Sequence, residues 1–128
     1  MLEENTLQFL KYLNLEDTNM ASFEGIKKFK NLKALDRLIL NKNKLERFGE
    51  IDGFKSLKSI SIENNLVAVP IAISELGRID SIEYFNIRHN PIGNKLGNGY
   101  VRQRSVAEFP RLTVINGADL KKYERKDC

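Results

Sequence analysis

Hydrophobic residues recur along the chain in one pattern, with large apolar side chains at positions i, i+3 and i+5. The copies begin at Leu10, Leu35, Leu57 and Ile82. In the second copy, alternation with period two sends Leu38 and Leu40 to one face of a short strand and Arg37 and Ile39 to the other. The pattern therefore predicts a series of short strands, each with an apolar face turned inward and an outward face that carries other side chains.

A polar residue follows each copy at a constant distance. It is Thr18 in the first copy and Asn43, Asn65 and Asn90 in the next three. The chain must bend away from the strand here, and an asparagine amide offers both a donor and an acceptor to backbone groups that the bend leaves unpaired. We expect the three asparagines to stack as a structural ladder. The bend at Thr18, which has only a hydroxyl, should be the loosest.

The segments that return from one strand to the next have apolar residues every third position. In the first segment these are Phe23, Ile26, Phe29 and Leu32. A period of three predicts short 3₁₀ or irregular helical turns packed against the sheet. The copies start 25, 22 and 25 residues apart, so the longer segments contain one additional turn of this kind.

The pattern changes after Ile92. Three glycines follow, Gly93, Gly97 and Gly99, and they predict a loop that leads into a helix ending near Phe109.

A fifth and shorter strand is expected near Leu112, followed by a turn at Asn116-Gly117 and a charged helical stretch over residues 119–127. A solenoid needs a polar end piece over its last repeat, and we interpret residues 93–128 as this C-terminal cap.

Aligned, the copies give L-x-x-L-x-L-x-x-N-x-L, which resembles the leucine-rich repeat of the 22-residue, intracellular subclass. The resemblance implies an α/β solenoid. A short curved parallel sheet would lie on the concave side, 3₁₀ or helical turns on the convex side, and a helical cap at the C-terminus. We expect residues 1–128 to form one domain with repeats starting near 10, 35, 57, 82 and 112.

The C-terminal segment resembles a narrower family. Residues 108–117, followed by Glu124-Arg125-Lys126-Asp127, are similar to the leucine-rich-repeat cap of tubulin-folding cofactor E and cofactor-E-like proteins. The resemblance implies a protein partner, either α-tubulin or another tubulin-folding cofactor, and a cytoplasmic, cytoskeleton-associated location. We expect the protein to be a monomer. We also expect the sequence to be a fragment of a longer chain, because Cys128 stands where the family's cap helix continues.

Composition and candidate chemistry argue against catalysis. Charged residues make up 30% of the chain and hydrophobic residues 41%, with a net charge of +4, which is typical of a globular domain that needs no nucleic acid. The one cysteine, Cys128, and the one histidine, His89, build neither a disulfide framework nor a metal site. No catalytic motif is present. We expect no enzyme activity, no cofactor, no metal and no membrane span.

The outward face of the sheet is the candidate binding surface. Its rows run across neighbouring strands, and Tyr12, Arg37 and Tyr84 are the natural anchors because aromatic residues and arginine dominate interface energetics. Ile39 is predicted to be an exposed apolar residue in the middle of the sheet. Each of these side chains could equally be solvated. The candidate partner-binding residues are Tyr12, Asn14, Arg37, Ile39, Lys42, Tyr84, Asn86, Arg88 and His89.

Three functions remain open on the sequence. The first is a tubulin-binding module of the cofactor E type. The second is a leucine-rich subunit of a ribonucleoprotein, although no set of stacking aromatic residues predicts RNA contact. The third is a regulatory or scaffold subunit of a phosphatase or a motor complex. Arg102 and Arg104, beside Tyr100, could meet an acidic surface, but a solvated helix face is the simpler interpretation.

Overall fold

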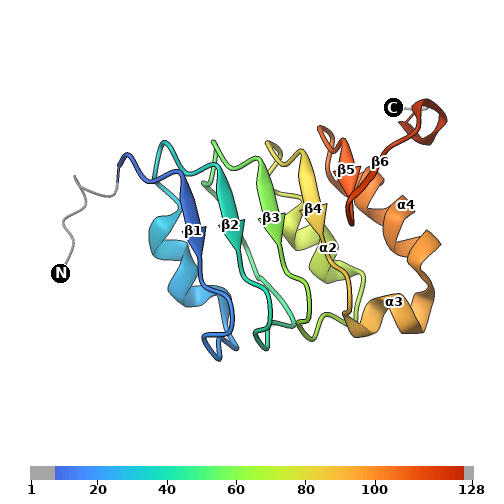
Figure 1. The fold of residues 1–128 in the computed structure, drawn as a ribbon, viewed down its shortest axis with the longest axis horizontal. Helices are drawn as coiled ribbons and strands as arrows, with labels where there is room; N and C mark the ends of the chain where they lie inside the picture. Colours follow the sequence, from blue (N-terminus) through green and yellow to red (C-terminus); the bar gives the residue numbers. More distant parts are fainter. Residues whose placement is uncertain (1–7, 126–128) are drawn as a thin grey trace.

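A computed structural model describes residues 8–125. Six short strands form one sheet in sequence order (Figure 1). The first five pair in parallel and the last pairs antiparallel to the fifth. The strands are β1 (Tyr12–Asn14), β2 (Arg37–Ile39), β3 (Ser59–Ser61), β4 (Tyr84–Asn86), β5 (Val114–Ile115) and β6 (Ala118–Asp119).

The register of the sheet follows the sequence repeat. Tyr12 pairs with Arg37, Arg37 with Ser59, Ser59 with Tyr84, and Tyr84 with Val114. Equivalent positions of the repeat thus lie side by side, as the pattern predicts. The predicted fold class, an α/β leucine-rich-repeat solenoid, is confirmed.

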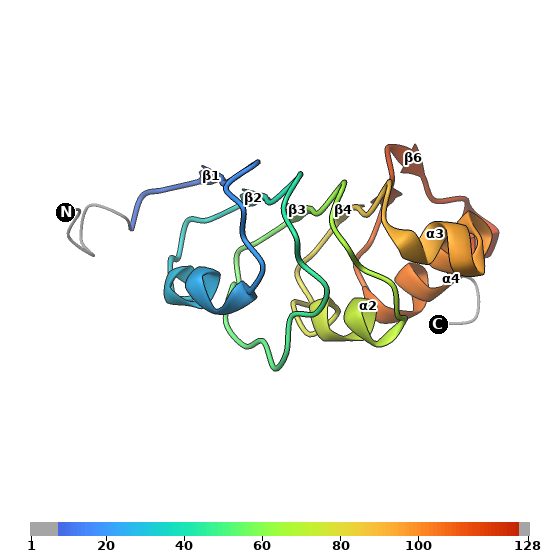
Figure 2. The same cartoon turned by 90° about the horizontal axis from the view of Figure 1, so that it is seen from below.

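The core lies between the sheet and the return segments, which all cover the same side of the sheet (Figure 2). Leu38 and Leu40 are fully buried, and so are their counterparts Ile60 and Ile62 in the next repeat. The first repeat is the least buried: Leu10, Leu13, Leu15 and Met20 pack only partly against the core. Among the described residues, β1 is the first strand of the sheet.

The return segments differ in their helical type. The first forms the predicted 3₁₀ helix, η1 (Phe23–Phe29), and the second has no regular helix. The third was predicted to be 3₁₀ or irregular and is instead an α-helix, α2 (Ile71–Leu76). Pro70 precedes its first turn and has the fixed φ that suits a helix start, and Ala72 gives it a strong helix former.

The prediction of a glycine loop after Ile92 was wrong. Two helices occupy this segment, α3 (Pro91–Leu96) and α4 (Asn98–Glu108), with a single break at Gly97. Proline suits the first position of a helix, and only Gly97, at φ 92°, has a backbone conformation that demands glycine. The predicted loop is therefore a one-residue corner between two helices.

The expected Asn116-Gly117 turn is present, with φ of 52° and 78°. Two positive φ values are typical of the tight turn that matches the twist of a hairpin, and here the turn joins β5 to β6. The predicted helix over residues 119–127 was largely wrong. Asp119 belongs to β6, and only a short 3₁₀ helix, η2 (Lys122–Arg125), follows. Residues 126 and 127 lie outside the described part.

Within residues 8–125, no helix combines the length and the apolar character needed to span a lipid bilayer.

Candidate protein-interaction surface

The side of the sheet opposite the return segments carries the side chains predicted to bind a partner. We call this surface, made by the outward residues of β1 to β5, the open face. Tyr12 and Tyr84 are about half exposed, at 49% and 47%. The guanidinium carbon of Arg37 lies 5.3 Å from the centre of the Tyr12 ring, a distance at which a cation is attracted by the ring face.

A hollow of about 690 Å³ lies in the middle of the open face. Its floor is β3, which carries the small side chains of Ser59 and Ser61, and its walls include Arg37 and Tyr84 on the neighbouring strands. The repeat pattern predicts the rows in which these residues lie, but it does not predict the hollow. The signal for it was two serines on one strand, at positions where neighbouring strands carry larger side chains.

Ile39 was wrongly predicted to be an exposed apolar contact. It lines the hollow, yet only 9% of its surface is exposed. Ile39 pairs with Asn14 on one side and Ser61 on the other, and such close cross-strand neighbours cover most of a side chain on a central strand. Ile39 therefore supports the surface more than it offers contact area.

Hydrogen bonds fix one end of the hollow. The Ser61 hydroxyl donates to Asn41 Oδ1 at 2.6 Å, and Asn86 Nδ2 donates to the Ser61 hydroxyl at 3.1 Å and to Glu63 Oε1 at 2.8 Å. Of the candidate residues, Asn86 is thus committed to an internal network. Asn14 likewise donates to the Tyr12 hydroxyl and accepts from the Glu16 backbone N–H.

The remaining candidates lie at the edge where the strands end. Lys42 and His89 are exposed and share φ values of 58° and 57° with Asp17 and Asn64 at the same repeat position. Each of the first four repeats therefore turns through a left-handed residue just before its ladder position. Arg88 is exposed, and its guanidinium donates to the Asn116 carbonyl. The structure brings Arg37, Tyr84 and Ile39 together at the hollow and leaves Lys42 and His89 outside it.

The asparagines at the bends connect one repeat to the next. The side chain of Asn65 accepts from Leu45 N–H at 3.0 Å and donates to the carbonyls of Leu40 and Ile62, each at 3.0 Å. Asn90 forms the same bonds one repeat later, with Val67 N–H and the carbonyls of Ile62 and Ile87. Each bond set joins the asparagine's own repeat to the preceding one.

The first member of the ladder, Asn43, has a different set of donors. Its Oδ1 accepts from the backbone N–H groups of both Thr18 and Met20, at 3.1 and 2.9 Å. The Thr18 hydroxyl donates to the Leu15 carbonyl at 2.9 Å. Thr18 is exposed, so water can reach these groups.

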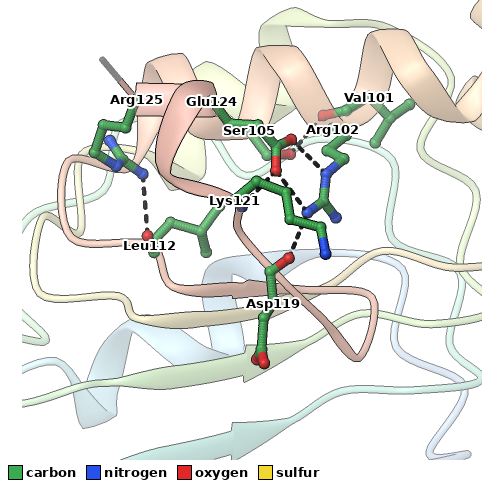
Figure 3. Close-up of polar contacts among 8 residues, drawn as sticks. All are labelled: Val101, Arg102, Ser105, Leu112, Asp119, Lys121, Glu124 and Arg125. Carbon is green, nitrogen blue, oxygen red and sulfur yellow. Dashed lines mark hydrogen bonds and ion pairs between the residues drawn. The ribbon is translucent and has the colours of Figure 1, made fainter.

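The cap is held by two arginines (Figure 3). Arg102 on α4 meets Glu124 through two hydrogen bonds, at 2.6 and 2.9 Å, and also donates to the Asp119 carbonyl. The Arg102 guanidinium, together with the Lys121 backbone N–H, lowers the pKa of the Glu124 carboxyl to about 2. Arg125 donates to the carbonyls of Val106, Phe109 and Leu112.

The solvated helix face predicted for Arg102 and Arg104 was therefore wrong. Arg104 donates to Glu108 at 2.9 Å and to the Ser74 hydroxyl on α2 at 2.6 Å. Arg102 ties α4 to the cap through Glu124, and Arg104 ties it to α2 through Ser74. The sequence could not show these two contacts because Glu124 and Ser74 lie 22 and 30 residues away along the chain.

Over residues 8–125, no three His, Cys, Asp or Glu side chains gather as metal ligands. The polar groups of the open face offer hydrogen bonds, one aromatic–cation contact and a shaped hollow. This arrangement suits recognition of another surface.

The fold and the open face define a leucine-rich-repeat-type domain, the class of solenoid that presents an extended face for protein binding. No protein-family model matches the chain. The domain is related to tubulin-folding cofactor E and to U2A′-like leucine-rich-repeat proteins, at distant identity over nearly its whole length.

The chain is 26% identical to the tubulin-folding cofactor E of Arabidopsis thaliana, over 98% of this chain and 26% of the relative. It is 25% identical to the U2 small nuclear ribonucleoprotein A′ of Homo sapiens, over 96% of this chain and 47% of the relative. The chain thus spans about a quarter of the first relative and about half of the second. Their names describe a folding cofactor and a ribonucleoprotein component, and neither is the name of an enzyme.

A crystal structure of the Drosophila melanogaster SNF/U2A′ complex has the same fold. The TM-score is 0.78 at 20% identity, over 99% of this chain and 72% of that chain. This likeness supports the architecture of the whole described domain, the cap included.

Proposed function

We propose that this domain is a non-catalytic protein-interaction module that binds tubulin, or a tubulin-folding partner, through its open face. The observation that carries the proposal is the relationship to tubulin-folding cofactor E over 98% of the chain. The open face supplies the physical means, since Tyr12 and Tyr84 are half exposed and Arg37 lies between their strands.

Binding would work by surface complementarity, with no cofactor and no bond chemistry. Aromatic and arginine side chains supply most of the binding energy at protein interfaces. Neighbouring strands lie about 4.8 Å apart, and the sheet fixes the positions of these anchors. The open face is therefore preformed. A preformed surface avoids the ordering cost that weakens binding by flexible segments. A tubulin partner would place the domain in the cytoplasm.

A pull-down of purified αβ-tubulin tests the proposal. The wild-type domain should retain tubulin, and the double variant Arg37→Ala/Tyr84→Ala should lose at least about 2 kcal/mol of binding free energy, which is the cost of removing interface anchors. The matched control is Arg111→Ala/Tyr123→Ala, which removes the same residue types from exposed positions outside the open face.

Circular dichroism would first verify that all three proteins fold. Equal tubulin binding by both double variants would contradict a role for the open face, and a folded wild type that retains no tubulin would contradict the choice of partner.

A second candidate function is a protein-binding subunit of a ribonucleoprotein. It is favoured by the relationship to U2 small nuclear ribonucleoprotein A′ and by the structural likeness to that protein in complex with SNF. This function would place the domain in the nucleus. The same three proteins, assayed against purified Drosophila SNF, compare the two candidates: retention of SNF without retention of tubulin would favour the second.

A further inference from the structure

Three polar groups at the hollow have no partner within residues 8–125. The Arg37 guanidinium forms no ion pair and donates no hydrogen bond, and the hydroxyls of Ser59 and Tyr84 form no hydrogen bond either. All three occupy one row of the open face, because Arg37 pairs with Ser59 and Ser59 with Tyr84. They therefore face the same small volume.

Three arginines of the described domain pair with carboxylates, and Arg37 does not. Arg47 meets Glu75, Arg102 meets Glu124 and Arg104 meets Glu108, at distances of 2.6 to 2.9 Å. The Arg37 guanidinium instead lies over the Tyr12 ring, with its central carbon 5.3 Å from the ring centre. A cation–π contact of this kind uses none of the guanidinium N–H donors in a hydrogen bond, so they remain available for an acceptor. The Glu63 carboxylate accepts a hydrogen bond from Asn86, which lines the hollow.

The spacing of the row suits one inserted side chain. Adjacent strands lie about 4.8 Å apart, so the walls at Arg37 and Tyr84, two strands from each other, stand about 10 Å apart at the backbone. Ser59 between them is small and leaves the hollow of about 690 Å³ open. The row offers hydrogen-bond donors from three residues. A carboxylate has two oxygens and no donor, and it pairs with arginine through two parallel hydrogen bonds.

Other charges around the hollow limit how much acid it can accept. Asp36, Lys58 and Glu83 also line the hollow. Each immediately precedes β2, β3 or β4, and their charges alternate in sign. Asp36 and Glu83 would repel a run of acidic residues laid along that side, since like charges oppose each other across a partner surface. Lys58 lies between them, so a single carboxylate directed at Arg37 meets less repulsion than a run of acidic residues would.

We infer that this slot, formed by Arg37, Ser59 and Tyr84, receives the carboxylate of an aspartate or glutamate side chain from the protein partner. The inference rests on the proposed use of the open face for protein binding, and not on the identity of the partner as tubulin. Arg37 supplies the counter-charge, and the two hydroxyls donate to the same carboxylate.

The test uses a carboxylate probe in place of a partner. The ¹⁵N-labelled domain would be titrated with the peptide Ac-Ala-Glu-Ala-NH₂ and, separately, with Ac-Ala-Gln-Ala-NH₂, which has the same shape without the charge. We expect saturable amide shifts on β2, β3 and β4 with the glutamate peptide only. Arg37→Gln should weaken this binding at least about tenfold, because hydrogen bonds to a charged group are the strong ones.

The control variant is Lys44→Gln, which removes one positive charge from an exposed position outside the hollow and should leave the titration unchanged. The inference is overturned by an absence of shifts, by equal shifts with the two peptides, or by equal weakening in the two variants. The tubulin pull-down reports separately on the partner. If the wild type binds the glutamate peptide but not tubulin, tubulin is rejected as the partner and the slot is retained. If it binds tubulin but not the peptide, the slot alone is rejected.

Discussion

Replacing Asn65 with alanine tests whether the asparagine ladder stabilises the fold by satisfying buried backbone groups. Asn65 is 3% exposed, and its Oδ1 accepts from the N–H of Leu45, which is fully buried. Its Nδ2 donates to the carbonyls of Leu40 and Ile62. Each carbonyl has a second donor, since Asn43 also reaches Leu40 and Asn90 also reaches Ile62.

The magnitude follows from which groups the variant leaves unpaired. The two carbonyls keep their second donor, so the Leu45 N–H is the group left without a partner in Asn65→Ala. A buried, unsatisfied donor costs about 1 to 3 kcal/mol. Loss of the packed side-chain atoms adds about 1 kcal/mol. We expect the free energy of unfolding to fall by about 3 kcal/mol.

Asn43→Ala gives the discriminating comparison. The side chain of Asn43 forms more hydrogen bonds than that of Asn65, including two from backbone N–H groups of the first repeat. Its donors at exposed Thr18 and half-buried Met20 can turn to water after the substitution. We therefore expect a smaller loss, about 1 kcal/mol.

Urea denaturation followed by circular dichroism measures both variants against the wild type, and equal slopes with denaturant would show that the same unfolding is compared. The reasoning would be refuted if Asn43→Ala cost as much as Asn65→Ala or more. That result would mean that the number of hydrogen bonds, and not the burial of the groups left behind, sets the value of a ladder position.

Two further predictions concern the return segments and the cap. Gly53 has φ 89°, and an added Cβ would lie 2.8 Å from a side-chain carbon of Lys30, so Gly53→Ala should lower the free energy of unfolding by more than about 1 kcal/mol. Gly25 has an ordinary φ and open space around it, so the control Gly25→Ala should have no such effect. Thermal denaturation measures both variants. The pKa of Glu124 is lowered from 4.5 to about 2, so its bond to Arg102 stabilises the cap above pH 4.5 and is lost as the pH falls toward 2. Glu124→Gln should remove that part of the acid dependence of the melting temperature, and an unchanged acid profile would contradict it.

The sequence predicted the parts of the fold that depend on period and on local turn chemistry. Leu38 and Leu40 point inward because alternation allows no other arrangement, and the Asn116-Gly117 pair sets the hairpin turn by its positive φ values. The helical type of the third return segment did not follow from its period. Spacings of three and four both put Ile73 and Leu76 on one buried face.

The sequence predicted which residues of the candidate site lie in one row, but it did not predict the hollow between them. Period and register place Arg37, Ser59 and Tyr84 side by side. The hollow arises because Ser59 is smaller than its neighbours, Arg37 and Tyr84, and a small residue gives no sign of a binding anchor in the sequence. The burial of Ile39 and the pairing of Arg102 with Glu124 depend on neighbours across strands or in the cap, and no local pattern contains that information.

The unequal lengths of the repeats separate two properties of the domain. From Tyr12 to Arg37 the chain takes 25 residues, and from Arg37 to Ser59 it takes 22, yet the three residues lie in one unbroken row. The extra length is absorbed entirely on the side with the return segments, where a 3₁₀ helix, an irregular stretch and an α-helix replace one another. Insertions there can thicken the back of the solenoid while the positions available for recognition keep their order.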